Sequence, residues 1–177
     1  MDKFKKQAET SQAKKTVTGS DGKSQLSVPG SWDTGLSLNS IASINAGNMM
    51  AGQYVIVITE SKKDFPKGIE LSAVAEAARQ TAKENFMVQN ISLGETRSTT
   101  VSGYPAIQFD SKGTAAGNTL CWTYTIIDAP KNYHQVITWS PESKLAENTP
   151  ILAEVTNSFK ELDNVGVPSV TPPAKKK

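Results

Sequence analysis

The sequence predicts an α+β fold in which an antiparallel β-sheet is sandwiched between helices. Four observations support this fold class. Several short segments show the apolar patterns of strands, an amphipathic segment in mid-chain has helical spacing, and a second such segment precedes the end. The late strands are joined by connections too short for the crossover that parallel neighbours require. The chain has 177 residues, which fits one domain.

The first half of the chain predicts three strands. Residues 25–29 place Leu26 and Val28 on one face and end at a Pro-Gly pair. Residues 36–44 form a weaker candidate strand, ended by an Asn-Ala-Gly-Asn stretch. Residues 54–59 are apolar on both faces, which is typical of a central strand covered on both sides.

The clearest helix is predicted over residues 72–87, with Ser72 as its N-cap. Its apolar residues recur at spacings of three and four, which places them in one core-facing stripe. The members of this stripe are Leu71, Val74, Ala75, Ala78, Ala82 and Phe86.

After the helix, an antiparallel meander is predicted. Its first strand, residues 91–99, is polar and suits a sheet edge. Its later strands are residues 104–110, 119–128 and 133–139. A flexible loop over residues 111–117 and a turn over residues 129–132 connect them, and both are short enough for hairpins.

The last predicted helix is interrupted. Residues 140–142 can start a first turn, but Pro150 would break a continuous helix, so a second segment is expected to restart with Thr149 as N-cap. The buried stripe expected of that segment is Ile151, Leu152, Val155, Phe159 and Leu162.

Charge and composition divide the chain into three parts. Residues 1–23 are predicted to be a disordered polar tether, residues 24–163 the folded domain, and residues 164–177 a disordered Pro/Lys tail. The first part carries six lysines against three acidic residues, and the last carries three lysines and no acidic residue. Because the formal net charge of the whole chain is +2, the net charge of the domain between them is −4. Because a nucleic-acid-binding domain needs a basic face, nucleic acid is not an expected partner.

No catalytic, cofactor-binding or metal-binding residue is predicted, and no cofactor is expected. The chain has one cysteine and one histidine, which excludes an intramolecular disulfide and a histidine relay. Cys121 suits a small core residue, and His134 suits a structural or surface position. The two could meet across a hairpin, but nothing supplies a nucleophile elbow or an oxyanion loop, so the protein is not expected to be an enzyme.

The other chemical patterns favour ordinary structural roles. Residues 113–117 are glycine-rich but lack a phosphate-binding pattern, and residues 60–64 suit a solvated charged loop. The glycosylation sequon at Asn90 is a frequent chance match. Three tryptophans could line a ligand groove, although core positions are favoured: Trp32, Trp122 and Trp139.

Three segments together resemble the PsbP-like family, which includes the Ran-binding Mog proteins and bacterial DcrB-type lipoproteins. The Leu-Ser-Val-Pro-Gly-Ser-Trp stretch of residues 26–32 resembles the opening of that fold. The Gly-Tyr-Pro-Ala stretch of residues 103–106 resembles the start of its second half, and Ser158-Phe159 resembles part of its closing helix. The resemblance covers residues 24–163. It implies a central antiparallel sheet between helices, and members that mostly bind partners or stabilise assemblies. No partner-binding residue can be carried over.

The resulting functional expectation is a non-catalytic cell-envelope module, a lipoprotein, that binds a protein partner or stabilises an assembly. A lipid anchor upstream of this chain would be its only membrane attachment, and its location would be periplasmic or otherwise extracytoplasmic. Two alternatives stay open: a cytoplasmic chaperone or adaptor for secreted effectors, and a small-molecule-binding domain. Neither the partner, the binding surface nor the oligomeric state can be assigned from the sequence.

Overall fold

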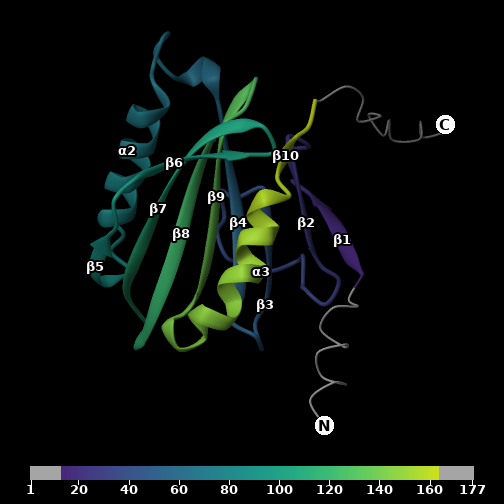
Figure 1. Ribbon diagram of the computed structural model, residues 1–177, viewed down its shortest axis with the longest axis vertical. Helices are drawn as coiled ribbons and strands as arrows, with labels where there is room; N and C mark the ends of the chain where they lie inside the picture. The colour runs from purple at the N-terminus through teal and green to yellow at the C-terminus, as the bar shows by residue number, and fades with distance from the viewer. Residues whose placement is uncertain (1–12, 164–177) are drawn as a thin grey trace, which may run out of the picture.

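The computed structural model describes residues 13–163, which form two antiparallel sheets and two main helices (Figure 1). The large sheet has the strand order β3-β4-β9-β8-β7-β5, and β6 pairs with β7 beside β5. The small sheet has the order β1-β2-β10. All strand pairs are antiparallel. The predicted fold class is therefore confirmed.

The bounds of the elements follow the chain. The large sheet contains β3 (Ile44–Asn48), β4 (Gln53–Ser61), β5 (Gln89–Leu93), β6 (Arg97–Val101), β7 (Tyr104–Ala115), β8 (Asn118–Asp128) and β9 (Asn132–Pro141). The small sheet contains β1 (Lys14–Thr18), β2 (Ser24–Pro29) and β10 (Lys160–Glu161). The helices are α2 (Leu71–Lys83) and α3 (Leu145–Asn157), with the short turns η1 (Lys62–Asp64) and η2 (Glu142–Lys144).

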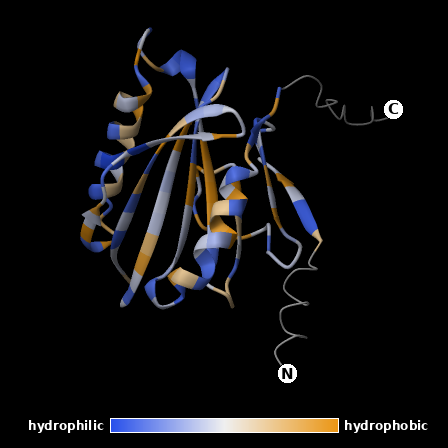
Figure 2. Ribbon diagram, in the orientation of Figure 1, coloured by the Kyte–Doolittle hydropathy of each residue, from blue (hydrophilic) through white to orange (hydrophobic). Residues whose placement is uncertain are grey.

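The two faces of the large sheet carry separate cores. On one face, Phe109 and Ile126 pack with the alanine-rich stripe of α2. On the other face, Val57 and Val136 pack with α3 and the small sheet. Adjacent residues Ile126 and Ile127 of β8 enter opposite cores, because successive side chains of a strand point to opposite faces. Figure 2 shows hydrophobic and polar residues alternating along both helices, as this packing requires.

The predicted tether is wrong in its second half, because β1 forms within it. Lys14 to Thr18 pair with Pro29 to Gln25 of β2, and Lys15 and Val17 are half-buried. The sequence there is too polar to suggest a strand, but an edge strand needs only backbone pairing on one side and can keep polar side chains in solvent. Residues 1–12 and the predicted tail over 164–177 lie outside the described residues.

The weak strand expected over residues 36–44 is also wrong, since β3 begins where that strand was expected to end. Asn45 is an internal residue of β3 rather than part of a turn, and its side chain also holds the preceding loop. Its Oδ1 accepts from Asn39 N (2.8 Å) and its Nδ2 donates to Ala42 O (3.2 Å). Gly47 permits the close approach of β4, because a Cβ there would collide with Gln53 O.

The first helix starts one residue early and ends before its predicted end. Glu70, rather than Ser72, occupies the N-cap position of α2. The helix ends at Lys83, after which Asn85 Oδ1 accepts from Met87 N (3.0 Å) and turns the chain toward β5. Phe86 therefore leaves the predicted stripe and is 91% exposed.

The meander differs from the prediction at its first strand and its first loop. The single edge strand expected over residues 91–99 is two strands, β5 and β6, that pair with successive parts of β7. The loop expected over residues 111–117 is mostly strand. Only Ala116 and Gly117 form the hairpin turn, both with positive φ (48° and 79°), as a two-residue type I′ turn requires. Strands β8 and β9 confirm the later predictions.

The last helix is continuous through Pro150, contrary to the predicted restart at Thr149. Asn148, only 1% exposed, connects the first turns of α3 to the β3–β4 turn and to the end of β9. Its Nδ2 donates to Ala51 O (2.9 Å) and Ser140 Oγ (2.9 Å), and its Oδ1 accepts from Gln53 Nε2 (2.9 Å). These bonds compensate for the backbone bond that proline cannot make. Phe159 lies beyond the helix but is fully buried, as its place in the stripe predicted.

Candidate functional site

His134 lies in the interior and joins the two sheets. Its side chain is 0% exposed, and its ring packs 4.8 Å from the ring of Phe159. Nδ1 lies 2.9 Å from Thr59 Oγ1 on the neighbouring strand β4, and Nε2 lies 2.8 Å from Glu161 Oε2 on β10. Both ring nitrogens are thus occupied by protein partners.

Glu161 is a buried acceptor for several donors besides the histidine. Its carboxylate accepts from the backbone N–H groups of Lys131 (3.0 Å) and Asn132 (3.1 Å) and from Asn132 Nδ2 (3.0 Å). Burial raises the pKa of Glu161, but the hydrogen bonds from His134, Asn132 and Lys131 outweigh it and hold that pKa below its usual value. Burial lowers the pKa of His134 more than Glu161 raises it. A neutral imidazole therefore donates from Nε2 to a carboxylate and accepts from Thr59 at Nδ1.

The structure does not bring Cys121 and His134 together. Cys121 is opposite Ser140 in the β8–β9 register, whereas His134 is opposite Ile127. Six residues of β9 separate the two positions, which is about 20 Å along a strand. Burial raises the pKa of the Cys121 thiol, so the reactive thiolate is disfavoured.

The three tryptophans divide between the core and the surface. Trp32 is 1% exposed, and its Nε1 donates to Gln53 Oε1 (3.0 Å). Trp122 and Trp139 are half-buried neighbours on the face that carries α2. Tyr54 stacks on Trp139 with ring centroids 5.3 Å apart. The core prediction therefore holds for Trp32 but not for the other two. The cavity beside Trp122 measures only about 10 Å³.

The charged residues after β4 and the sequon are surface features. Lys62 in η1 forms an ion pair with Asp128 (2.5 Å) and lies 5.0 Å from the ring centroid of Tyr133. This contact anchors η1 on the β8–β9 hairpin, so the predicted solvated loop is partly docked. Asn90 is exposed in β5 and has a positive φ of 53°.

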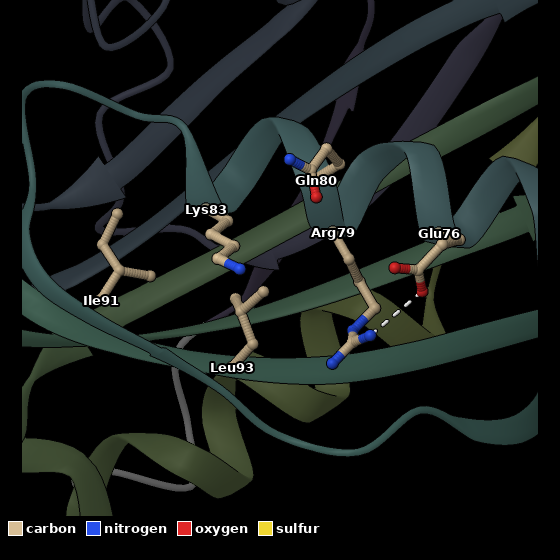
Figure 3. Close-up of a pocket in the computed structure, with 6 residues that line it drawn as sticks. All are labelled: Glu76, Arg79, Gln80, Lys83, Ile91 and Leu93. Carbon is tan, nitrogen blue, oxygen red and sulfur yellow. Dashed lines mark hydrogen bonds and ion pairs between the residues drawn. The ribbon is translucent and has the colours of Figure 1, made fainter.

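A hollow of about 270 Å³ lies between α2 and β5 (Figure 3). Its central cation, Arg79, is already engaged. The guanidinium donates to Glu76 Oε2 (3.0 Å) and Gly94 O (3.0 Å), and it lies 5.8 Å from the ring centroid of Phe109. Figure 3 shows the guanidinium extended toward Glu76, with Lys83 and Leu93 on the other side. Arg79 therefore fastens the β5–β6 connection to the helix.

A second concave surface, which we call the α3 groove, lies between α3 and strands β6 to β9. Its volume is about 250 Å³. Its lining residues are Arg97, Thr99, Gln108, Cys121, Thr123, Thr138, Leu145, Thr149, Leu152, Ala153, Thr156 and Asn157. Most of them carry a hydroxyl, amide or guanidinium group, so the lining offers many hydrogen-bond donors and acceptors.

A network of polar side chains crosses the sheet at the edge of the α3 groove. Arg97 makes two hydrogen bonds to Asp110, from Nη1 to Oδ2 (3.0 Å) and from Nη2 to Oδ1 (3.2 Å). Thr123 Oγ1 donates to Asp110 Oδ1 (2.8 Å), and Gln108 Nε2 donates to Thr125 Oγ1 (2.9 Å). The network holds these side chains in fixed orientations. The arrangement suits recognition by hydrogen bonds, so the α3 groove is the candidate binding site.

Nothing in the sequence indicated the α3 groove. Cys121 and Thr123 of β8 line it together with residues of α3, and no local pattern shows that α3 leaves part of this sheet face uncovered. Among residues 13–163, no group of three or more His, Cys, Asp or Glu side chains is arranged to hold a metal ion. None of the helices in this part of the chain combines the length and hydropathy of a membrane-spanning segment.

Comparison with known proteins shows the fold. No protein-family model matches the sequence, and no curated protein sequence matches it. The solution structure of the cyanobacterial PsbP of Synechocystis sp. PCC 6803 superposes with a TM-score of 0.63 at 9% identity, covering 85% of this chain and 93% of that one. LpqN of Mycobacterium tuberculosis, involved in cell envelope biogenesis, superposes with a TM-score of 0.61 at 12% identity, covering 88% and 94%. A structure from Bacteroides thetaiotaomicron VPI-5482 has a TM-score of 0.56 at 11% identity, covering 85% and 49%. The chain therefore has the PsbP-like fold.

Proposed function

We propose that this protein is a non-catalytic module of the cell envelope that binds a protein partner in the α3 groove. The observation that carries the proposal is the pre-ordered, hydrogen-bonding lining of this groove, with the Arg97–Asp110–Thr123 network at its edge. Such a surface can bind the backbone and polar side chains of a partner segment without reorganising.

The chemistry of the interior supports a non-catalytic role. His134 is fully buried with both ring nitrogens hydrogen-bonded, and Cys121 has a raised thiol pKa and lies far from it. A general base must reach the proton that it abstracts, and a buried, doubly bonded imidazole cannot do so without local unfolding.

The cell-envelope assignment rests on structural likeness and on the sequence expectation. LpqN is involved in cell envelope biogenesis, and this chain has the same fold. A lipid anchor upstream of the chain remains part of the proposal. The upstream reading frame and fractionation of the source cells test it: a frame without a leader, with the protein recovered in the cytosol, would contradict it.

The two alternative functions have less support. A small-molecule site around the tryptophans would need a sizeable cavity, and the one beside Trp122 measures about 10 Å³. A chaperone for apolar helices would need an apolar groove, whereas the α3 groove has a mostly polar lining.

Ala153→Arg tests the proposed binding site. Ala153 is an exposed residue of α3 that lines the groove, so an arginine fills the groove while keeping a good helix former in the helix. Partners would be captured from envelope extracts with the full chain and identified by mass spectrometry. We expect Ala153→Arg to lose the partner that the wild-type chain captures.

The matched control is Ala77→Arg, which makes the same change on the exposed side of α2, beyond the other face of the sheet. This control is expected to keep the partner. Equal capture by Ala153→Arg and the wild type would contradict binding in the α3 groove.

A further inference from the structure

The exposed hydrophobic side chains of this protein are concentrated at one end of the molecule. Of the six large hydrophobic residues exposed among residues 13–163, four lie in two turns: Met49 (68%), Met50 (89%), Phe86 (91%) and Met87 (68%). We call these four residues the apolar end. We propose that the apolar end inserts into the surface of a lipid bilayer and holds the protein against it.

The topology brings the two turns to the same end of the large sheet. Met49 and Met50 form the β3–β4 turn, which follows the Asn48–Gln53 pair. Lys144 Nζ donates to Met50 O (2.9 Å), which places the start of α3 beside this turn. Leu145, 36% exposed, lies there as well. The remaining exposed hydrophobic residue, Ile41, lies before the opposite end of β3.

The second turn belongs to the same end because of the β5–β7 register. Phe86 and Met87 precede β5, whose first residue, Gln89, pairs with Thr114 near the tip of the β7–β8 hairpin. That tip pairs Ala115 with Asn118. Figure 1 shows the α2–β5 loop, the β7–β8 tip and the β3–β4 turn at the lower part of the large sheet, and Figure 2 shows hydrophobic residues where α2 meets that loop.

Aromatic side chains form a row between the two turns. Tyr54, Trp139 and Trp122 are opposite one another on β4, β9 and β8, and all three are half-buried. The row lies within four residues of the start of β4, the end of β9 and the start of β8, which are at the same end of the large sheet as the two turns. Tyrosine and tryptophan at such a level are typical of the interface between hydrocarbon and water, where their rings and their polar groups are both accommodated.

The shape of the apolar end favours a fluid apolar medium over a protein surface. The two turns are separated by the width of strands β4 to β5, roughly 20 Å at about 4.8 Å per strand. Between them lie the β7–β8 tip, whose turn residues Ala116 and Gly117 carry no large apolar side chain, and the Lys112–Glu142 ion pair. A protein partner would need a matching surface across this whole width, whereas each turn can enter a lipid surface independently.

The start of the described chain supports the same orientation. Lys15 Nζ hydrogen-bonds to Trp32 O, and Asp33 pairs with Gly47, one residue before the end of β3. The chain therefore enters the domain on the side of the Met49–Met50 turn. A lipid anchor upstream of the chain would be compatible with this orientation, and this one argument rests on the proposed envelope function. The exposure of the apolar end does not.

Vesicle flotation tests the proposal. The full chain would be mixed with vesicles of pure phosphatidylcholine, because the lysine-rich ends would bind anionic lipid by charge alone. The test variant is Met50→Glu/Phe86→Glu, and both side chains are exposed enough for the fold to be kept. We expect this variant to lose about tenfold or more in vesicle partitioning, since removing an apolar side chain from lipid and adding a charge both oppose insertion.

The control is Ile41→Glu, which changes the exposed hydrophobic residue outside the apolar end and is expected to partition as the wild type does. The fluorescence emission of Trp122 and Trp139 supplies a second measurement, with the buried Trp32 as an unchanging background. Brominated lipid should quench this emission in the wild type and in Ile41→Glu, but not in the Met50→Glu/Phe86→Glu variant. Three results would overturn the proposal. The first is no vesicle binding by the wild type, and the second is equal vesicle binding by the Met50→Glu/Phe86→Glu and Ile41→Glu variants. The third is that the wild type does not bind vesicles but uses the apolar end for a protein contact or for self-association, which the Met50→Glu/Phe86→Glu variant loses.

Discussion

Nε2 of His134 lies 2.8 Å from Oε2 of Glu161, and this contact joins β9 of the large sheet to β10 of the small sheet. Neither residue is near the other in the chain. The contact fixes the position of the small sheet over the core that α3 covers.

The His134–Glu161 contact predicts a loss of stability in acid. Burial holds the pKa of folded His134 below its ordinary value of 6.5, so the unfolded chain binds the proton first. The stability contributed by the neutral imidazole is complete above 6.5 and declines as the pH falls below it. Because the chain has one histidine, His134→Gln should remove the pH dependence of stability that begins as the pH falls below 6.5. Urea unfolding across this range measures it, and greater stability at pH 5 than at pH 7 would show a charged imidazole in the fold.

Glu161→Gln should destabilise the protein by roughly 1–3 kcal/mol, because an amide presents hydrogens to some of the four donors that the carboxylate satisfies. Glu154→Gln is the control. Glu154 pairs with Lys14 on the surface with 62% of its side chain exposed, so its change should cost about 1 kcal/mol or less. Similar midpoints of urea unfolding for the two variants would contradict the structural role given to Glu161.

Phe159→Ala should cost roughly 3–5 kcal/mol, as expected for a fully buried aromatic residue in a packed core. The sequence favoured a core position for Trp122, but Trp122 is half-buried at the surface, so Trp122→Ala should cost clearly less. Chemical denaturation of both variants gives the order. A larger loss for Trp122→Ala would mean that the α2 face is covered more completely than described.

Asn148→Ala should destabilise the start of α3, since it leaves Gln53 and the backbone carbonyls of Ala51 and Gly52 without their buried partner. The loss should be about 2 kcal/mol or more. Hydrogen exchange should then quicken in the turn before Pro150. Unchanged exchange there would show that this turn is stable without the side chain.

Removal of residues 1–12 and 164–177 should leave partner capture unchanged, because the α3 groove lies within residues 13–163. Removal of residues 1–23 should lower the melting temperature, because it deletes β1 and exposes the edge of β2. Thermal unfolding of the two truncated chains compares them. Equal melting temperatures would restore the boundary that the sequence suggested.

The sequence alone determined the antiparallel sheet, the order of its later strands and the core stripe of α2. The periodicity of apolar residues and the length of a connection depend only on residues that are close in the chain, so the structures that they predict do not depend on distant segments. Predictions from local sequence were wrong where contacts with distant segments stabilise a structure that the local sequence disfavours. Pro150 lies within α3 because Asn148 is hydrogen-bonded to the β3–β4 turn, and β1 forms because β2 supplies a partner edge.

The candidate sites depend almost wholly on the tertiary structure. The α3 groove exists because a helix remote in sequence leaves part of β6 to β9 uncovered, and the apolar end exists because the strand register aligns Met50 and Phe86 at one end of the sheet. A hydrophobic residue has the same local pattern whether a neighbour covers it or not. Its exposure is decided by segments far away in the chain, which is why Phe86 was expected in the core and is found in solvent.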